Sequence, residues 1–131
     1  MKLYNTQSRR LEEFTPQNPK EVKIYTCGPT VYSFAHIGNL TSYVYWDLLV
    51  RTLQANGWGV KRVMNLTDVG HLVSDADDGE DKMEKGARRE GLTVWDIAKK
   101  YSDAFLKDFR ALNVVEPTKI CPATEYIEQQ E

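Results

Sequence analysis

Residues 24–39 read Ile24-Tyr25-Thr26-Cys27-Gly28-Pro29-Thr30-Val31-Tyr32-Ser33-Phe34-Ala35-His36-Ile37-Gly38-Asn39. This stretch joins a short β-rich run, a Cys-Gly-Pro break and the start of a long apolar segment. A strand that passes through a glycine turn into a helix is a phosphate-binding geometry, because the helix N-terminus presents unpaired N–H groups and about half a positive charge to an anion. The stretch therefore predicts an anion site where a helix begins.

The segments on either side predict a βαβ unit over residues 21–70. Apolar and polar residues alternate over Val22–Thr26, which is typical of a strand, and Trp58–Leu66 has the composition of a second strand. Between them, Leu40–Ala55 carries apolar residues around most of its circumference, so we expect a mostly buried helix. A strand, a helix and a strand at this spacing imply a parallel sheet with a right-handed crossover.

Polar residues follow both predicted strands. Cys27-Gly28 comes directly after the first strand, and Thr67-Asp68 comes directly after the second. Open α/β sheets bind their ligands at the carboxyl ends of the strands. We therefore expect these two pairs of residues to converge on one crevice.

The rest of the chain divides into three predicted parts. Residues 1–20 form a β-hairpin and a loop, residues 71–92 an acidic loop with a short charged helix, and residues 93–131 a helical segment. Within the last part, Thr93 is the predicted N-cap of a helix over Val94–Leu112. The predicted elements elsewhere are strands at Leu3–Asn5 and Leu11–Phe14, a helix at Lys82–Glu90, an extended segment or loop at Lys119–Ala123 and a last helix over Ala123–Glu131. Because two strands rarely make a stable parallel sheet, we expect an incomplete, amino-terminal part of a larger domain.

Composition and charge exclude several classes of protein. The 131 residues carry a net charge of -2, so the chain lacks the global basic field of many nucleic-acid-binding domains, although Arg9-Arg10 and residues 85–89 are local basic patches. The sequence has neither an apolar leader nor a run of apolar residues long enough for a membrane span. Cys27 and Cys121 do not make a disulfide framework, so a reducing cytoplasm is the expected location.

The run His36-Ile37-Gly38-Asn39 has two interpretations. An imidazole and a carboxamide on the first turn of a helix can hydrogen-bond phosphate oxygens, and Gly38 would let a nucleotide approach the backbone closely. Alternatively, the same residues form an ordinary turn with Asn39 as the N-cap. Residues 28–32 precede this run at the expected place, which favours the phosphate site.

Several runs together resemble the amino-terminal part of cysteinyl-tRNA synthetases. They are Tyr25–Tyr32, Ala35–Asn39, Asn65–Val69 and the opening Leu3–Thr6. The similarity extends with few gaps from Leu3 to Val69 and resumes loosely over Phe105–Leu112. It implies the amino-terminal half of an α/β, Rossmann-like class I synthetase catalytic core with a short N-terminal β-hairpin. It also implies a cytoplasmic, monomeric enzyme that uses ATP with Mg²⁺ to join cysteine to tRNA(Cys).

The resemblance implies roles for individual residues. His36 and Asn39 would be catalytic, and Thr30, Tyr32, His36, Gly38 and Asn39 would bind ATP. Cys27, Gly28 and Thr67 would contact the substrate cysteine, and Cys27 would also be a ligand of Zn²⁺, which prefers a soft thiolate to the hydroxyl of serine. The family's remaining zinc ligands and its Lys-Met-Ser-Lys-Ser loop would follow Glu131. This chain alone would therefore not complete a catalytic cycle.

Some residues keep a plainer alternative. Cys27 could be a buried strand-end cysteine, and Cys121 is expected to be structural, although a zinc site made of Cys27, Cys121, His36 and His71 is conceivable. His71 and the acidic run Asp75–Asp81 belong to a segment that resembles an insertion, and we expect a solvated loop there in preference to a cation site. Lys85, Arg88 and Arg89 could contact tRNA phosphates or simply form a charged surface.

Two other functions stay open at this point. The chain could be a truncated, non-catalytic paralogue that binds a nucleotide or a partner. It could also belong to the related cysteine ligase of mycothiol synthesis, which acts on an amino sugar and shares the fold and part of the motif pattern.

Overall fold

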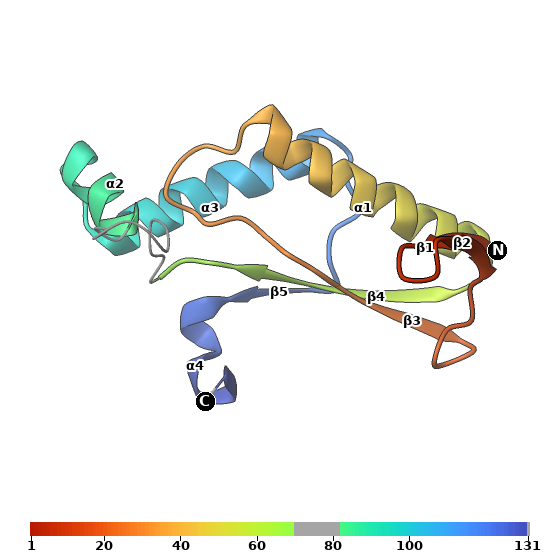
Figure 1. The fold of residues 1–131 in the computed structure, drawn as a ribbon. Coiled ribbons are helices and arrows are strands. Elements are labelled where there is room, and N and C mark those ends of the chain that lie inside the picture. The colour runs from red at the N-terminus through yellow and green to blue at the C-terminus, as the bar shows by residue number, and fades with distance from the viewer. Residues whose placement is uncertain (70–81, 131) are drawn as a thin grey trace.

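The computed structural model describes residues 1–69 and 82–130, and Figure 1 shows their arrangement. Strands β1 (Lys2–Asn5) and β2 (Arg10–Glu13) pair antiparallel as the predicted N-terminal hairpin. Within the described residues, a second sheet has the order β3-β4-β5 and is parallel throughout. Its strands are β3 (Glu21–Thr26), β4 (Gly59–Leu66) and β5 (Lys119–Pro122). The helices are α1 (Ile37–Ala55), α2 (Lys82–Glu90), α3 (Val94–Ala111), the short 3₁₀ turn η1 (Ala123–Glu125) and α4 (Ile127–Gln130).

The parallel βαβ unit is confirmed, and a third strand extends it. Glu21 of β3 lies opposite Gly59 of β4, and the pairing continues to Thr26 and Met64. The segment that was expected as extended or loop is strand β5, in which Lys119 pairs with Val63. Four residues that end in proline carry little strand signal, so pairing with β4 decides their conformation.

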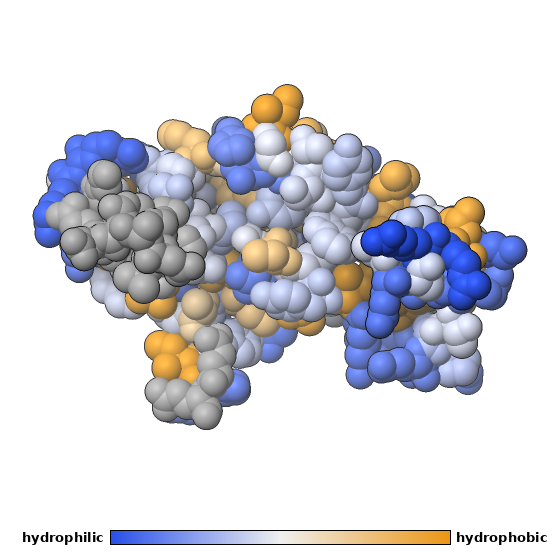
Figure 2. All heavy atoms as spheres, in the orientation of Figure 1, coloured by the Kyte–Doolittle hydropathy of each residue, from blue (hydrophilic) through white to orange (hydrophobic). Residues whose placement is uncertain are grey.

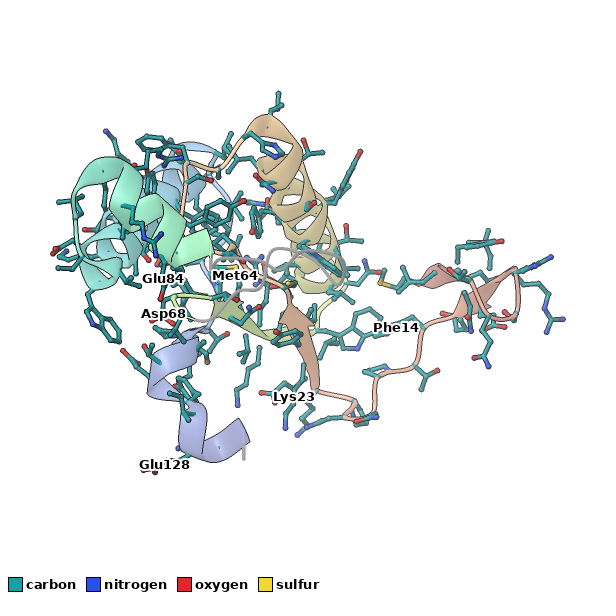
Figure 3. All side chains as sticks on the ribbon, turned by 60° about the vertical axis from the view of Figure 1, so that its left-hand side comes forward. Phe14, Lys23, Met64, Asp68, Glu84 and Glu128 are labelled. Carbon is teal, nitrogen blue, oxygen red and sulfur yellow. The ribbon has the colours of Figure 1, made fainter. Side chains whose placement is uncertain are left out.

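Helices α1 and α3 lie along one face of this sheet, and α4 lies on the other side (Figure 1). One core cluster joins Tyr43 of α1, Met64 of β4, and Phe105 and Phe109 of α3. In Figure 3, Met64 lies among the side chains between the sheet and the helices. A second cluster brings α2 to the sheet and contains Val31, Leu66, Met83, Ala87, Ile97, Ala98 and Tyr101. The core therefore occupies the space between one sheet face and three helices.

Helix α1 differs from the prediction in its start and in its burial. It begins at Ile37, one turn before the expected Leu40, because His36 caps its N-terminus. The prediction of a mostly buried helix is wrong: the buried residues of α1 are Tyr43, Val50 and Leu53, whereas Tyr45 and Leu48 are exposed. One face packs on the sheet and α3, and the apolar residues extend around the helix beyond that face. Figure 2 shows hydrophobic side chains at the surface over the start of α1.

The other predicted elements fall as follows. Helices α2 and α3 begin where expected, and Thr93 is the N-cap of α3, with its hydroxyl accepting a hydrogen bond from the Asp96 N–H at 3.1 Å. The expected last helix is split into η1 and α4. The predictions for His71 and Asp75–Asp81 lie outside the described residues. Among the helices of residues 1–69 and 82–130, none combines the length and the apolar character that a bilayer crossing requires.

Candidate functional site

The backbone brings the segment after β3 alongside the end of β4. The Thr67 N–H donates to the Pro29 carbonyl at 2.9 Å, and the Val31 N–H donates to the Thr67 carbonyl at 3.0 Å. Gly28 lies so close to β4 that an added Cβ would stand 1.7 Å from the Asn65 carbonyl oxygen. Thr30 therefore lies beside Thr67, whereas Gly28, directly after Cys27, lies beside Asn65, two residues before Thr67.

The predicted phosphate site is the capped N-terminus of α1. The His36 Nδ1 atom accepts a hydrogen bond from the Gly38 N–H at 3.1 Å, and the Asn39 Oδ1 atom accepts one from the His36 N–H at 3.1 Å. The N-cap is thus His36 and not Asn39, so the plainer alternative for this run is wrong in its detail. Because Nδ1 is an acceptor here, the neutral ring carries its proton on Nε2. His36 Nε2 and Asn39 Nδ2 are then the side-chain atoms left to donate to an anion.

A hollow of about 210 Å³ gathers most of the predicted nucleotide residues. Thr30, Tyr32, His36 and Asn39 line it, together with other residues of the 29–36 segment. Tyr101 and Phe105 of α3 form the opposite wall, which the sequence did not assign to a site. The Phe34 ring meets the Tyr101 ring edge-on, with centroids 5.0 Å apart. The amphipathic pattern of α3 indicated burial, and the same pattern could not tell a core position from a position on the wall of a hollow.

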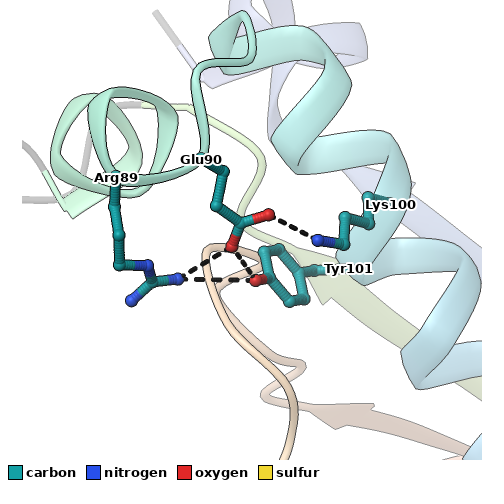
Figure 4. Close-up of polar contacts among 4 residues, drawn as sticks. All are labelled: Arg89, Glu90, Lys100 and Tyr101. Carbon is teal, nitrogen blue, oxygen red and sulfur yellow. Dashed lines mark hydrogen bonds and ion pairs between the residues drawn. The ribbon is translucent and has the colours of Figure 1, made fainter.

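A charged cluster between α2 and α3 holds the Tyr101 side chain, which lines this hollow, in place (Figure 4). The Glu90 carboxylate accepts hydrogen bonds from the Lys100 ammonium and the Tyr101 hydroxyl, and Arg89 Nη2 lies 3.0 Å from the same carboxylate. Hydrogen bonds from Lys100, Tyr101 and Arg89, in that order of effect, lower the pKa of Glu90 to about 2. The end of α2 is thereby tied to the helix that forms one side of the hollow.

A second hollow, of about 680 Å³, lies at the ends of β3, β4 and β5. Its lining includes Tyr25, Asn65, Thr67 and Cys121. The Asn65 carboxamide connects three of its neighbours: Oδ1 lies 2.7 Å from the Gly28 nitrogen and 2.9 Å from the Tyr25 hydroxyl, and Nδ2 lies 3.2 Å from Thr67 Oγ1. Sequence reasoning gave Asn65 no role, although a polar residue near a strand end, two positions before Thr67, was a usable signal.

Asp68 does not join the crevice in the way that its position suggested. Its side chain is buried, with Oδ1 accepting from the Thr124 N–H at 3.0 Å and Oδ2 from the Thr124 hydroxyl at 2.6 Å. The carboxylate therefore holds the chain that follows β5 against the end of β4.

The two cysteines are free thiols with different surroundings. Cys27 is exposed, which contradicts the alternative of a buried strand-end cysteine, and Cys121 is half-buried. Among the described residues, no three His, Cys, Asp or Glu side chains come together in a group that could hold a metal ion. The conceivable set of Cys27, Cys121 and His36 is therefore not assembled, and His71 lies outside the described residues. The described residues do not by themselves fit a zinc ion.

The basic residues of α2 lie on the surface. Arg88 and Arg89 are exposed, with Arg88 Nη2 3.9 Å from Glu84 and Arg89 bound to Glu90. The Lys85 side chain is outside the described atoms. Contact of these residues with tRNA stays a prediction.

Comparison with known proteins gives consistent results. The family model described as tRNA synthetases class I (C) catalytic domain matches residues 13–130. "Cysteine--tRNA ligase 1" of Burkholderia lata is 57% identical over 128 residues, which are 98% of this chain and 27% of that protein. "Cysteine--tRNA ligase" of Borreliella burgdorferi is 51% identical over 127 residues, 97% of this chain and 26% of that protein. The chain thus spans about a quarter of the length of these curated relatives.

One solved structure extends the comparison to the fold. A LeuRS of Agrobacterium radiobacter, in a ternary complex with tRNA and LeuAMS, superposes with a TM-score of 0.63 at 21% sequence identity. The match covers 85% of this chain and 13% of that one. At this identity the likeness shows the fold alone, an α/β class I synthetase catalytic fold.

Proposed function

The chain belongs to the family of class I (C) tRNA synthetase catalytic domains, and we propose that the whole protein is an ATP-dependent cysteine–tRNA ligase. In this reaction the cysteine carboxylate attacks the α-phosphorus of ATP in line, forms cysteinyl-adenylate and releases pyrophosphate. The cysteinyl group then passes to the 3′ end of tRNA(Cys), which breaks the bond to the adenylate and releases AMP. Identities of 50–57% to proteins named cysteine–tRNA ligase, over nearly the whole chain, support the proposal.

The nucleotide side of the proposed site is the hollow at the start of α1. ATP, with its Mg²⁺, would place its phosphates against the first turn of α1, where His36 Nε2 and Asn39 Nδ2 are donors. Thr30 and Tyr32 line the same hollow, and Gly38 has no side chain on the first turn, where an added Cβ would stand 3.0 Å from His36 Cε1. Catalysis on this side would consist of positioning and of stabilising charge on the transferred phosphorus. The capping geometry of His36 is the observation that carries this assignment.

The amino-acid side is assigned to Cys27, Gly28 and Thr67. Support comes from the exposed Cys27 thiol and from the close pairing of this segment with Thr67. Zinc binding by Cys27 would need ligands from other parts of the protein. Metal analysis of the whole protein and of a Cys27→Ser variant tests that part, and an unchanged zinc content would exclude Cys27 as a ligand.

The partners follow from the same proposal. They are cysteine, ATP and tRNA(Cys), and the protein would act as a monomer in the cytoplasm. Charging of tRNA(Cys) by the purified protein separates a tRNA ligase from a ligase that acts on an amino sugar. Absence of any cysteine-dependent pyrophosphate exchange would instead favour a non-catalytic paralogue.

Variants of His36 test the catalytic assignment in protein made from the complete gene. His36→Ala removes both the cap and the imidazole, whereas His36→Ser keeps a side-chain oxygen that can cap the helix. We expect both variants to lower ATP–pyrophosphate exchange by roughly 10²- to 10³-fold, the usual loss for a donor that acts on the transition state. Binding of cysteine should change little. Normal exchange in His36→Ser would refute a catalytic role and leave His36 as a helix cap.

A further inference from the structure

The Asn65 carboxamide occupies the centre of a small polar network at the ends of β3 and β4. Its Oδ1 atom meets the Gly28 N–H at 2.7 Å and the Tyr25 hydroxyl at 2.9 Å, and its Nδ2 atom meets the Thr67 hydroxyl at 3.2 Å. Asn65 is half-buried, and Tyr25, Asn65 and Thr67 all line the second hollow. The network therefore lies in the wall of a cavity that a small molecule can enter.

The direction of every hydrogen bond in this network is determined. A backbone N–H can only donate, so the atom of Asn65 that faces Gly28 has to be the carbonyl oxygen. That oxygen carries no hydrogen, so the Tyr25 hydroxyl donates to it. The amide nitrogen then faces Thr67 and can only donate, so the Thr67 oxygen accepts.

These directions decide what the two hydroxyl groups offer to a ligand. Thr67 has an oxygen lone pair occupied by Asn65, which leaves its O–H free to donate. Tyr25 has its hydrogen occupied, which leaves its oxygen free to accept. Because both hydroxyls bind the same carboxamide, one small ligand can reach both of them. The cavity wall thus presents a donor and an acceptor side by side.

We propose that Asn65 is a positioning residue that gives this wall the polarity of an α-amino acid site. The Thr67 O–H would donate to the ligand carboxylate, and the Tyr25 oxygen would accept from the ligand ammonium group. The opposite orientation of the ligand would place its carboxylate at Tyr25, farther from the nucleotide hollow. Thr67 is nearer to that hollow, because its backbone pairs with Pro29 and Val31, which line it. The carboxylate, which has to reach the nucleotide, is then at the correct end. This inference rests on the proposed function and specifies how its amino-acid side is built.

The substitution Asn65→Asp reverses one bond and preserves two. An aspartate still accepts from Gly28 and Tyr25, but its second oxygen can only accept from Thr67, so the Thr67 hydrogen is no longer offered to a ligand. In protein from the complete gene, we expect the KM for cysteine in pyrophosphate exchange to rise roughly tenfold, the loss of about one hydrogen bond to a charged group. The KM for ATP should stay unchanged, which a general loss of structure would not allow.

The double variant Asn65→Asp/Thr67→Val separates the hydrogen bond from the added charge. Thr67→Val alone should raise the KM for cysteine by about the same factor, because it removes the same donor. If Asn65 acts through Thr67, the double variant is no worse than either single variant. If the new carboxylate only repels the substrate, the two effects multiply, and the proposal is overturned.

Tyr25→Phe provides a test that does not depend on the folding of Asn65→Asp. The Tyr25 ring is 65% exposed, so loss of its hydroxyl should not affect folding. We expect a severalfold rise in the KM for cysteine, and an unchanged KM overturns the assignment of the ammonium group. Wild-type protein without cysteine-dependent exchange would overturn the proposed function itself, whereas active wild type with an unchanged Asn65→Asp variant would overturn only the role of Asn65.

Discussion

Gly28→Ala tests most directly how the candidate site is built. The Cβ atom that this substitution adds would lie 1.7 Å from the Asn65 carbonyl oxygen, 2.9 Å from its carbon and 3.0 Å from Met64 Cγ. The nearest two atoms belong to the backbone of β4, so no change of side-chain rotamer relieves the overlap. A carbon and a carbonyl oxygen need about 3.3 Å between them, which requires the two segments to separate by about 1.5 Å.

A separation of that size would break the hydrogen bonds that join the segment after β3 to the end of β4. They are Gly28 N to Asn65 Oδ1 at 2.7 Å, Thr67 N to the Pro29 carbonyl at 2.9 Å, and Val31 N to the Thr67 carbonyl at 3.0 Å. At about 1 kcal/mol for each bond, the local destabilisation is about 3 kcal/mol. Opening of this edge of the sheet should then become roughly 100-fold more frequent.

Amide hydrogen exchange of peptides that cover residues 28–32 and 64–68 measures this opening. Gly57→Ala is the matched control: Gly57 has φ of 89°, and its added Cβ would meet no described atom within 4 Å. That substitution should cost about 1 kcal/mol of backbone strain at the end of α1 and leave the exchange of both peptides unchanged. If Gly28→Ala exchanges no faster than Gly57→Ala in these peptides, the close packing of Gly28 on β4 is not a constraint and the reasoning fails.

Three further predictions concern the helices and the core. In Gly38→Ala, the added Cβ lies 3.0 Å from His36 Cε1, so the imidazole ring should shift and the KM for ATP in pyrophosphate exchange should rise. The thermal midpoint should stay the same or rise, because alanine has a higher helix propensity than glycine, by up to about 1 kcal/mol. The folded-state pKa of Glu90 is about 2, against an ordinary value of 4.5. The ionised carboxylate therefore stabilises the folded protein fully above pH 4.5, and this contribution is lost as the pH falls from 4.5 to 2. Across that window the thermal midpoint of Glu90→Gln should fall less steeply than that of wild type, and parallel curves would contradict a stabilising role of the Glu90 cluster. Arg62 is 2% exposed and lies over the Phe109 ring at 5.5 Å, and its guanidinium nitrogens have no hydrogen-bond partner among the described residues. Because a buried charge without a partner destabilises the fold, Arg62→Met should raise the free energy of unfolding in urea titrations by about 1 kcal/mol. A loss of stability would instead reveal an acceptor for the guanidinium group.

The fold prediction succeeded where the local pattern has one physical solution. Alternating residues at 22–26, an apolar helix ended by Asn56-Gly57 and a second β-rich run can bury their apolar faces together in a parallel βαβ unit. The same reasoning could not recognise β5, because a short segment with a proline becomes a strand only when β4 supplies partners. It also overestimated the burial of α1, because an apolar sequence shows how much surface can be buried and not how much surface the neighbours cover.

For the candidate site, sequence by itself determined which residues lie at the strand ends and at the start of α1. Cys27, Gly28, Thr67 and His36 follow from the order of elements and from local turn and capping chemistry, which act over a few residues. Tertiary structure alone decided the directions of the groups around them. The Asn65 carboxamide binds Gly28 and Thr67, the Asp68 carboxylate binds Thr124, and Tyr101 lines the hollow that we propose for the nucleotide. Apart from the Asn65–Thr67 hydrogen bond, these contacts join residues far apart along the chain, and they form only after the backbone has brought those residues within hydrogen-bonding or van der Waals distance.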